Sequence, residues 1–176
     1  MPRPLVATVD IAAMRHNLNI ARAATPRSNV WAVVKANAYG HGLARGMRAF
    51  SDADGLALIE VDSAIRLREM GWQKPILLLE GFFDQADLPV VAAHDIQVAV
   101  HCNEQIDMLA QAKPGLRIDV HLKMNSGMNR LGFRPEEFRA AYERLRATAS
   151  VASISMMTHF ANADDPSNAG MPMAVG

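Results

Sequence analysis

Short apolar runs alternate with amphipathic stretches along most of this chain. Nearly continuous apolar runs predict buried strands, and they lie at 30–34, 55–59, 75–79, 96–100, 116–122 and 151–157. Stretches with apolar residues three and four positions apart predict helices, and these lie at 43–50, 62–70, 85–94, 104–111 and 135–146. From residue 30 onward the pattern therefore predicts a regular strand–helix repeat.

The two ends of the chain depart from this repeat. Residues 5–10 have the composition of a strand, and Asp10 stands where it can cap a helix from Ile11 to about Ala23. Thr25-Pro26 should end that helix, because the residue before a proline avoids the helical conformation. The final stretch, 162–176, is rich in Asp, Asn, Gly and Pro and predicts a loop.

Alternation of buried strands with helices predicts an α/β fold with a parallel sheet and helices outside it. The strands begin at an even spacing of about 20 to 25 residues, which favours a β/α barrel over an open doubly wound sheet. A closed barrel has eight strands in about 250 residues. We therefore predict an incomplete TIM-type (β/α)8 barrel with about six βα units, part of a larger protein. A complete, smaller open sheet is the alternative.

Composition excludes several classes of function. The 18 basic and 18 acidic residues cancel, so there is no basic excess for nucleic acid or for a membrane surface. No apolar run approaches the ~20 residues of a membrane span, and the N-terminus lacks a signal-peptide apolar core. A single cysteine excludes an internal disulfide. We expect a cytoplasmic protein.

Three titratable residues fall at the C-terminal ends of predicted strands, where β/α barrels place their chemistry. Lys35 follows the run 30–34, Lys123 follows 116–122, and His159 follows 151–157. Desolvation beside a core can lower the pKa of a lysine amine. The neutral amine can then attack a carbonyl. The alternative for Lys35 is a strand-end lysine that points to water. His101-Cys102 lies near the same end of a strand, but a third metal ligand does not follow, so we predict no metal site.

Two longer motifs give these positions a context. The first is Val34-Lys35-Ala36-Asn37-Ala38-Tyr39-Gly40-His41, and the second runs from Lys123 through Ser126-Gly127-Met128 and Arg130 to Leu131-Gly132-Phe133. Both resemble the alanine racemases, enzymes that use pyridoxal 5'-phosphate (PLP). The resemblance extends from Ala7-Thr8-Val9-Asp10 to Thr158-His159-Phe160-Ala161, about the first half of such an enzyme.

The resemblance implies a role for each matching residue. Lys35 would carry PLP as a Schiff base and move the α-proton of the substrate on one face. Tyr39 would reach the cofactor phosphate, and Arg130 would bond the cofactor's phenolic oxygen and hold the substrate carboxylate. His159 would pack against the pyridine ring. Lys123 matches a lysine that many members carry as a carbamate, which would orient Arg130. The alternatives are loop packing for Tyr39, a core histidine for His159, and an Arg130 that only pins its own loop.

The resemblance also implies a function and a wider architecture. The function would be the interconversion of L- and D-alanine, which supplies D-alanine for cell-wall peptidoglycan, in a homodimer. Residues 1–10 would form a strand of a C-terminal β-domain outside this chain, and residues 11–176 would form part of the PLP barrel. A tyrosine of the partner's β-domain would be the second base, so we expect these 176 residues alone to racemise poorly.

Three other functions remain open from the sequence. The first is a PLP-homeostasis barrel that does not racemise, which generally lacks the segment 123–133 as it stands here. The second is a PLP-dependent decarboxylase of the same barrel class. The third is a non-catalytic, truncated domain. Two carboxylates near the predicted site, Glu60 and Asp62, are predicted to be a helix cap and a solvated charge.

Overall fold

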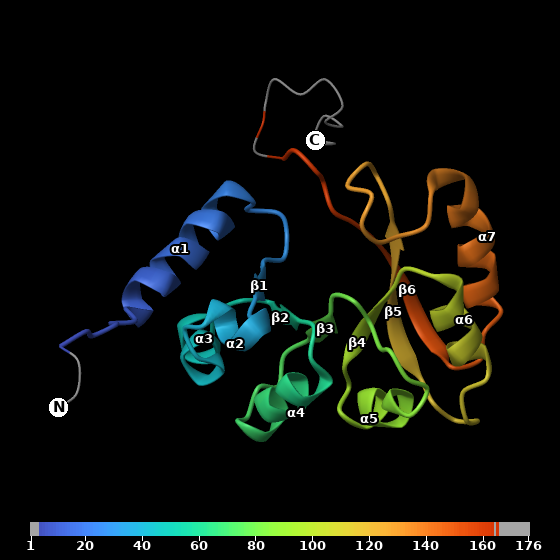
Figure 1. The fold of residues 1–176 in the computed structure, drawn as a ribbon, viewed down its shortest axis with the longest axis horizontal. Coiled ribbons are helices and arrows are strands. Elements are labelled where there is room, and N and C mark those ends of the chain that lie inside the picture. The colour runs from blue at the N-terminus through green and yellow to red at the C-terminus, as the bar shows by residue number, and fades with distance from the viewer. Residues whose placement is uncertain (1–3, 164, 166–176) are drawn as a thin grey trace. The chain divides into compact units, whose positions relative to one another are not determined.

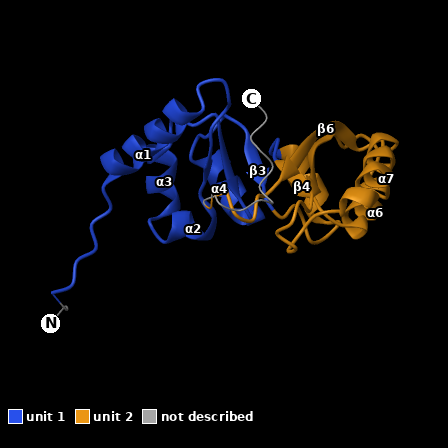
Figure 2. Cartoon of the chain, turned by 90° about the horizontal axis from the view of Figure 1, so that it is seen from above, with its two compact units in different colours: residues 1–79, 94–96 blue, residues 80–93, 97–176 orange. Residues whose placement is uncertain are grey.

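The computed structural model describes residues 4–163 and 165, and it divides the chain into two compact units. Unit 1 comprises residues 1–79 and 94–96, and unit 2 comprises residues 80–93 and 97–176 (Figure 2). Each unit contains three strands, which are parallel to their neighbours and follow one another in chain order (Figure 1). No helix among the described residues is long and apolar enough to cross a membrane.

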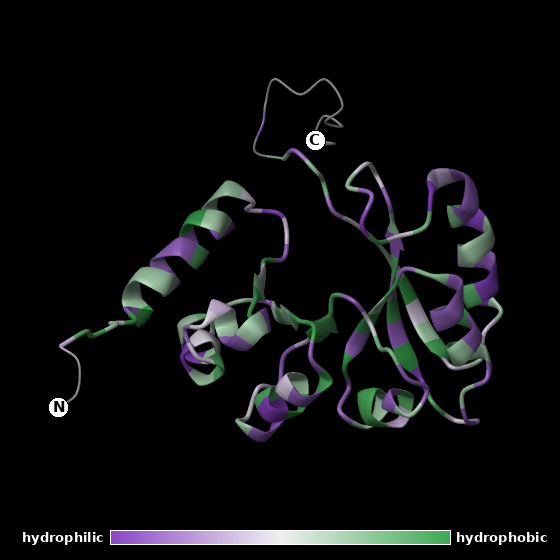
Figure 3. Ribbon diagram, viewed as in Figure 1, coloured by the Kyte–Doolittle hydropathy of each residue, from purple (hydrophilic) through white to green (hydrophobic). Residues whose placement is uncertain are grey.

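Unit 1 is built around three short strands: β1 (Trp31–Val33), β2 (Gly55–Leu58) and β3 (Ile76–Leu78). Trp31 pairs with Gly55, and Leu56 pairs with Ile76. Every residue of β2 and β3 is buried, as expected for parallel strands covered on both faces, and β3 is strongly apolar (Figure 3). The helices of unit 1 are α1 (Ile11–Ala24), α3 (Leu43–Ala49) and α4 (Val61–Glu69), with a one-turn segment, α2 (Lys35–Tyr39).

Unit 2 contains longer strands: β4 (Gln97–Val100), β5 (Ile118–Met124) and β6 (Val151–Thr158). Val98 pairs with Val120, and Val120 pairs in turn with Ile154. The helices are α5 (Asp87–Ala93), α6 (Asn103–Ala110) and α7 (Pro135–Arg146). Helix α7 lies against β5 and β6 and buries Phe138, Ala141 and Leu145, while its outer surface is hydrophilic (Figure 3).

The predicted elements agree with the structure to within a few residues. All six strands from residue 30 onward and all five later helices are present, and α7 has the predicted bounds. Asp10 caps α1 as expected, because its Oδ1 accepts hydrogen bonds from the N–H groups of Ala12 (2.8 Å) and Ala13 (3.0 Å). The α/β class and the incomplete barrel of about six βα units are therefore confirmed.

Two details of the prediction are wrong. Residues 5–10 form no strand; they pair with no other described strand, and Leu5 and Val6 are 88% and 82% exposed. Lys123 does not follow β5 but is its next-to-last residue, so it belongs to the sheet. Of the predicted C-terminal loop, residue 164 and residues 166–176 lie outside the described part of the chain. The assignment of residues 1–10 to a separate β-domain stays a prediction.

Candidate functional site

Directly after β1 the chain makes a turn of the rare left-handed kind. Ala36, Asn37, Ala38 and Tyr39 have φ angles of +50°, +56°, +53° and +52°. In this conformation the Cβ atom of an L-residue crowds the following carbonyl oxygen, at a cost of about 1–2 kcal/mol per residue. The sequence did not predict the turn, because alanine ordinarily favours the right-handed helix. Four such residues in succession indicate a conformation that the surrounding structure must enforce.

Hydrogen bonds that span this left-handed turn, and one that reaches beyond its C-terminal end, hold its conformation. The N–H groups of Ala38 and Gly40 donate to the carbonyls of Val34 and Ala36, at 2.9 and 3.0 Å. Asn37 Oδ1 accepts a hydrogen bond from the N–H of Leu43 (2.8 Å), which is the first residue of α3. The Asn37 side chain therefore ties the turn to the following helix, and it serves there as a cap that Gly42 lacks.

A carboxylate from the neighbouring strand connection holds the beginning of the turn. The Ala36 N–H donates to Glu60 Oε1 with an N···O distance of 3.2 Å. The other carboxylate oxygen, Oε2, is buried and has no hydrogen-bond partner among residues 4–163 and 165. Glu60 occupies the N-cap position of α4, but its side chain makes no capping bond there. The prediction that Glu60 is a helix cap is therefore wrong for its side chain.

Lys35 opens the turn and is half-buried. Within the described residues its Nζ makes no hydrogen bond and no ion pair, so the amine has no competing partner. Tyr39 ends the turn with 59% of its surface exposed. Unit 1 thus presents an accessible amine and, four residues later, an accessible phenol at the C-terminal end of β1.

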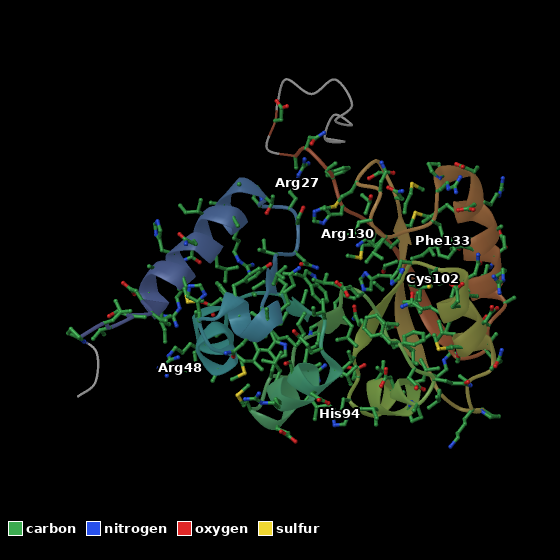
Figure 4. All side chains as sticks on the ribbon, in the orientation of Figure 1. Arg27, Arg48, His94, Cys102, Arg130 and Phe133 are labelled. Atoms are coloured by element: carbon green, nitrogen blue, oxygen red, sulfur yellow. The ribbon has the colours of Figure 1, made fainter. Side chains whose placement is uncertain are left out.

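In unit 2 the segment after β5 forms a closed loop, residues 125–132. Its base is fixed where the Asn125 N–H donates to the Phe133 carbonyl (2.8 Å) and the Phe133 N–H donates to the Lys123 carbonyl (2.9 Å). Inside the loop, Asn125 Oδ1 accepts from the N–H groups of Gly127 (3.1 Å) and Asn129 (3.0 Å). Figure 4 labels Arg130 in this loop and Phe133 at its base.

The loop, the end of β5 and the end of β6 border one narrow depression. It is lined by residues of the segment 123–131, among them Lys123 and Arg130, and by His159. Lys123 is 5% exposed, while Arg130 and His159 are exposed. Unit 2 therefore brings three of the predicted site residues together. Their individual roles stay predictions.

His101 and Cys102 lie in the connection that follows β4, also in unit 2. Burial lowers the pKa of His101, against a hydrogen bond between the ring and the Glu80 carbonyl that raises it. Burial likewise raises the pKa of the Cys102 thiol, which keeps it protonated near neutral pH. These shifts are typical of structural residues, because an unreactive thiol and a neutral imidazole both fit a partly buried connection.

Comparison with known proteins identifies relatives along almost the whole chain. The family described as "Alanine racemase, N-terminal domain" matches residues 9–174. The alanine racemase of Janthinobacterium sp. (strain Marseille) is 64% identical over 98% of this chain and 48% of its own length. That of Albidiferax ferrireducens is 53% identical over 99% of this chain and 47% of its own. This chain spans about half the length of the curated relatives it matches.

Solved structures give the same result. The biosynthetic alanine racemase of Pseudomonas aeruginosa superposes with a TM-score of 0.90 and 38% identity, covering 96% of this chain and 48% of that one. The alanine racemase of E. faecalis superposes with a TM-score of 0.80 and 34% identity, covering 90% of this chain and 44% of that one. The two proteins share the described fold with this chain over nearly its whole length.

Proposed function

This chain belongs to the alanine racemase family, and from that premise we propose that it provides the cofactor-binding part of an enzyme that interconverts L- and D-alanine. The observation that carries the proposal is the half-buried amine of Lys35, which has no partner among the described residues and begins an enforced left-handed turn at the end of β1. An amine held in this way is suited to attack a carbonyl.

Each unit offers side chains that suit chemical groups of PLP. The amine of Lys35 suits an aldehyde, and the exposed phenol of Tyr39 suits a phosphate oxygen. The guanidinium of Arg130 suits a phenolate or carboxylate oxygen, and the imidazole of His159 offers a flat surface for an aromatic ring. When bound, PLP supplies an electron sink for the negative charge left at the substrate α-carbon.

Each residue has a proposed task in the reaction. On one face of the α-carbon, Lys35 Nζ removes the proton of one alanine enantiomer or, in the opposite direction of the reaction, delivers a proton to the α-carbon. Arg130 holds the substrate carboxylate. Lys123 is buried and lines the same depression as Arg130, and we assign it a carbamate that would pair with Arg130.

The wider setting of the enzyme is part of the same proposal. Racemisation needs a second base on the opposite face of the α-carbon, and we assign it to a tyrosine from a β-domain of the partner subunit in a homodimer. The product D-alanine would serve peptidoglycan synthesis in the cytoplasm. The similarity over half the length of the alanine racemases supports this setting.

The decisive experiment measures cofactor loading and racemisation on the same samples. The full chain is incubated with PLP and reduced with borohydride, and the modified peptide is located by mass spectrometry. We expect the label on Lys35 and its loss in Lys35→Ala, while Lys113→Ala, at an exposed lysine of unit 2, keeps it. Conversion of L-alanine is then followed by chiral chromatography, with a partner β-domain supplied where needed.

The products separate the alternatives. Loading at Lys35 without D-alanine or pyruvate, even with a β-domain present, would indicate a PLP-homeostasis protein. Loss of CO2 from an amino acid would indicate a decarboxylase. Absence of any label on Lys35 would contradict the proposal as a whole.

A further inference from the structure

We propose that Glu60 is a positioning residue, whose carboxylate holds the left-handed turn that carries Lys35. The proposal rests on the proposed function for its relevance to PLP, but not for the contact itself. Glu60 was predicted to be only a helix cap, and the two motifs that resemble the family do not include it.

The Glu60 carboxylate binds the N–H of Ala36, the residue directly after Lys35. The first N–H groups of any helical turn have no partner inside the turn. The bond from Ala38 N–H to the Val34 carbonyl is a backbone contact that spans the turn, and the Asn37 bond to Leu43 acts beyond the turn. The bond of Ala36 N–H to Glu60 Oε1 is the side-chain contact at its beginning, directly after Lys35. It therefore limits rotation about the backbone that aims the Lys35 side chain.

The direction of the Glu60 side chain costs it favourable interactions at the start of its own helix. At the N-terminus of α4 its carboxylate could accept bonds from free helix N–H groups and interact favourably with the helix dipole. Instead it reaches a residue 24 positions earlier and leaves Oε2 buried without a partner in the described part of the chain. A buried acceptor without a donor destabilises the fold. An arrangement kept against such a cost is best explained by the turn that it holds.

Asp62 provides a matched comparison. It is a carboxylate two residues later, in the first turn of the same helix, and it is exposed. It shares the charge and the helix end with Glu60, but it makes no bond to the turn. A change at Asp62 therefore reports general effects of removing a carboxylate at the start of α4.

The test compares Glu60→Gln, Glu60→Ala and Asp62→Ala in the full chain. The first readout is hydrogen exchange at the Ala36 amide without cofactor, followed by NMR. The second is the rate of PLP attachment to Lys35. Glu60→Gln keeps an acceptor oxygen, so we expect both rates to stay within about twofold of the parent. For Glu60→Ala we expect amide exchange about tenfold faster, as one lost hydrogen bond implies, and slower PLP attachment. Asp62→Ala should match the parent.

Each outcome has a defined meaning. Unchanged Ala36 exchange in Glu60→Ala, or equal impairment of Glu60→Gln and Glu60→Ala, would overturn the proposal. If Glu60→Ala does not fold, Glu60→Leu keeps the side-chain volume without an acceptor and carries the same expectation. If the parent protein takes up no PLP, the proposed function fails, while the exchange rates still decide whether Glu60 holds the turn.

Discussion

The turn after β1 in unit 1 and the loop after β5 in unit 2 both present predicted site residues, but different forces shape them. The turn consists of non-glycine residues at positive φ, and a Cβ added at Gly40, directly after it, would meet nothing within 4 Å. The loop is closely packed at its base, since a Cβ at Gly132 would lie 2.7 Å from the Asn125 nitrogen. Backbone conformation is therefore the main constraint on the turn, and backbone packing is the main constraint on the base of the loop.

The largest expected effect follows from the packing of the loop. Gly132→Ala adds a methyl group against the backbone that closes the loop, at a φ of +118°. We expect unit 2 to lose about 2–4 kcal/mol of unfolding free energy, from overpacking together with backbone strain. Gly127→Ala in the same loop has a φ of +125° and open space, so it isolates the strain, about 1 kcal/mol.

Urea unfolding of the two variants, followed by amide exchange in β5, measures this difference. Gly40→Ala in unit 1 should resemble Gly127→Ala, because its added Cβ also meets open space. Equal losses in Gly132→Ala and Gly127→Ala would contradict the description of the loop as packing-limited.

The same contrast explains what the sequence could predict. The bounds of α7 followed from Pro135-Glu136-Glu137 and an apolar face, which are local signals. The left-handed turn did not follow, because Ala36 and Ala38 have no local preference for positive φ. Glu60 was assigned to its own helix because its partner lies on a different connection, 24 residues away. Residues 5–10 have strand composition, but a strand also needs a neighbour to pair with.

A smaller effect tests the strain in the turn. Ala36→Gly removes the Cβ at a φ of +50°. The relief, about 1–2 kcal/mol, exceeds the entropy that glycine adds to the unfolded chain, so unit 1 should gain about 0.5 kcal/mol. Ala140→Gly, at an exposed position inside α7, should instead lose about 1 kcal/mol. Thermal unfolding of both variants shows whether each substitution raises or lowers the stability. A loss in Ala36→Gly equal to that in Ala140→Gly would show that the turn stores no strain.

The smallest expected effect is a difference between the two units in how their stability depends on pH. Burial lowers the pKa of His101 and His121 in unit 2 below the usual 6.5, so the unfolded state binds their protons more readily than the folded state. Unit 2 should therefore lose stability as the pH falls below about 6.5. In unit 1 a hydrogen bond from the Val30 N–H lowers the pKa of Asp54 from 3.8, with a smaller contribution from Arg22. The contribution of Asp54 to the stability of unit 1 is therefore fully present above pH 3.8. It is lost only as the pH falls through the lowered pKa of the folded state.

Hydrogen exchange between pH 7 and pH 5, corrected for the intrinsic rate, measures this difference. Protection in β4 and β5 should decrease, while protection in β1 and β2 should stay constant. His121→Gln should reduce the decrease, because it removes one of the two buried imidazoles and the hydrogen bond of its Nε2 to Gln97. His16→Gln, at an exposed position of α1, should leave it unchanged. A parallel loss of protection in both units would mean that the histidines of unit 2 do not set its response to acid.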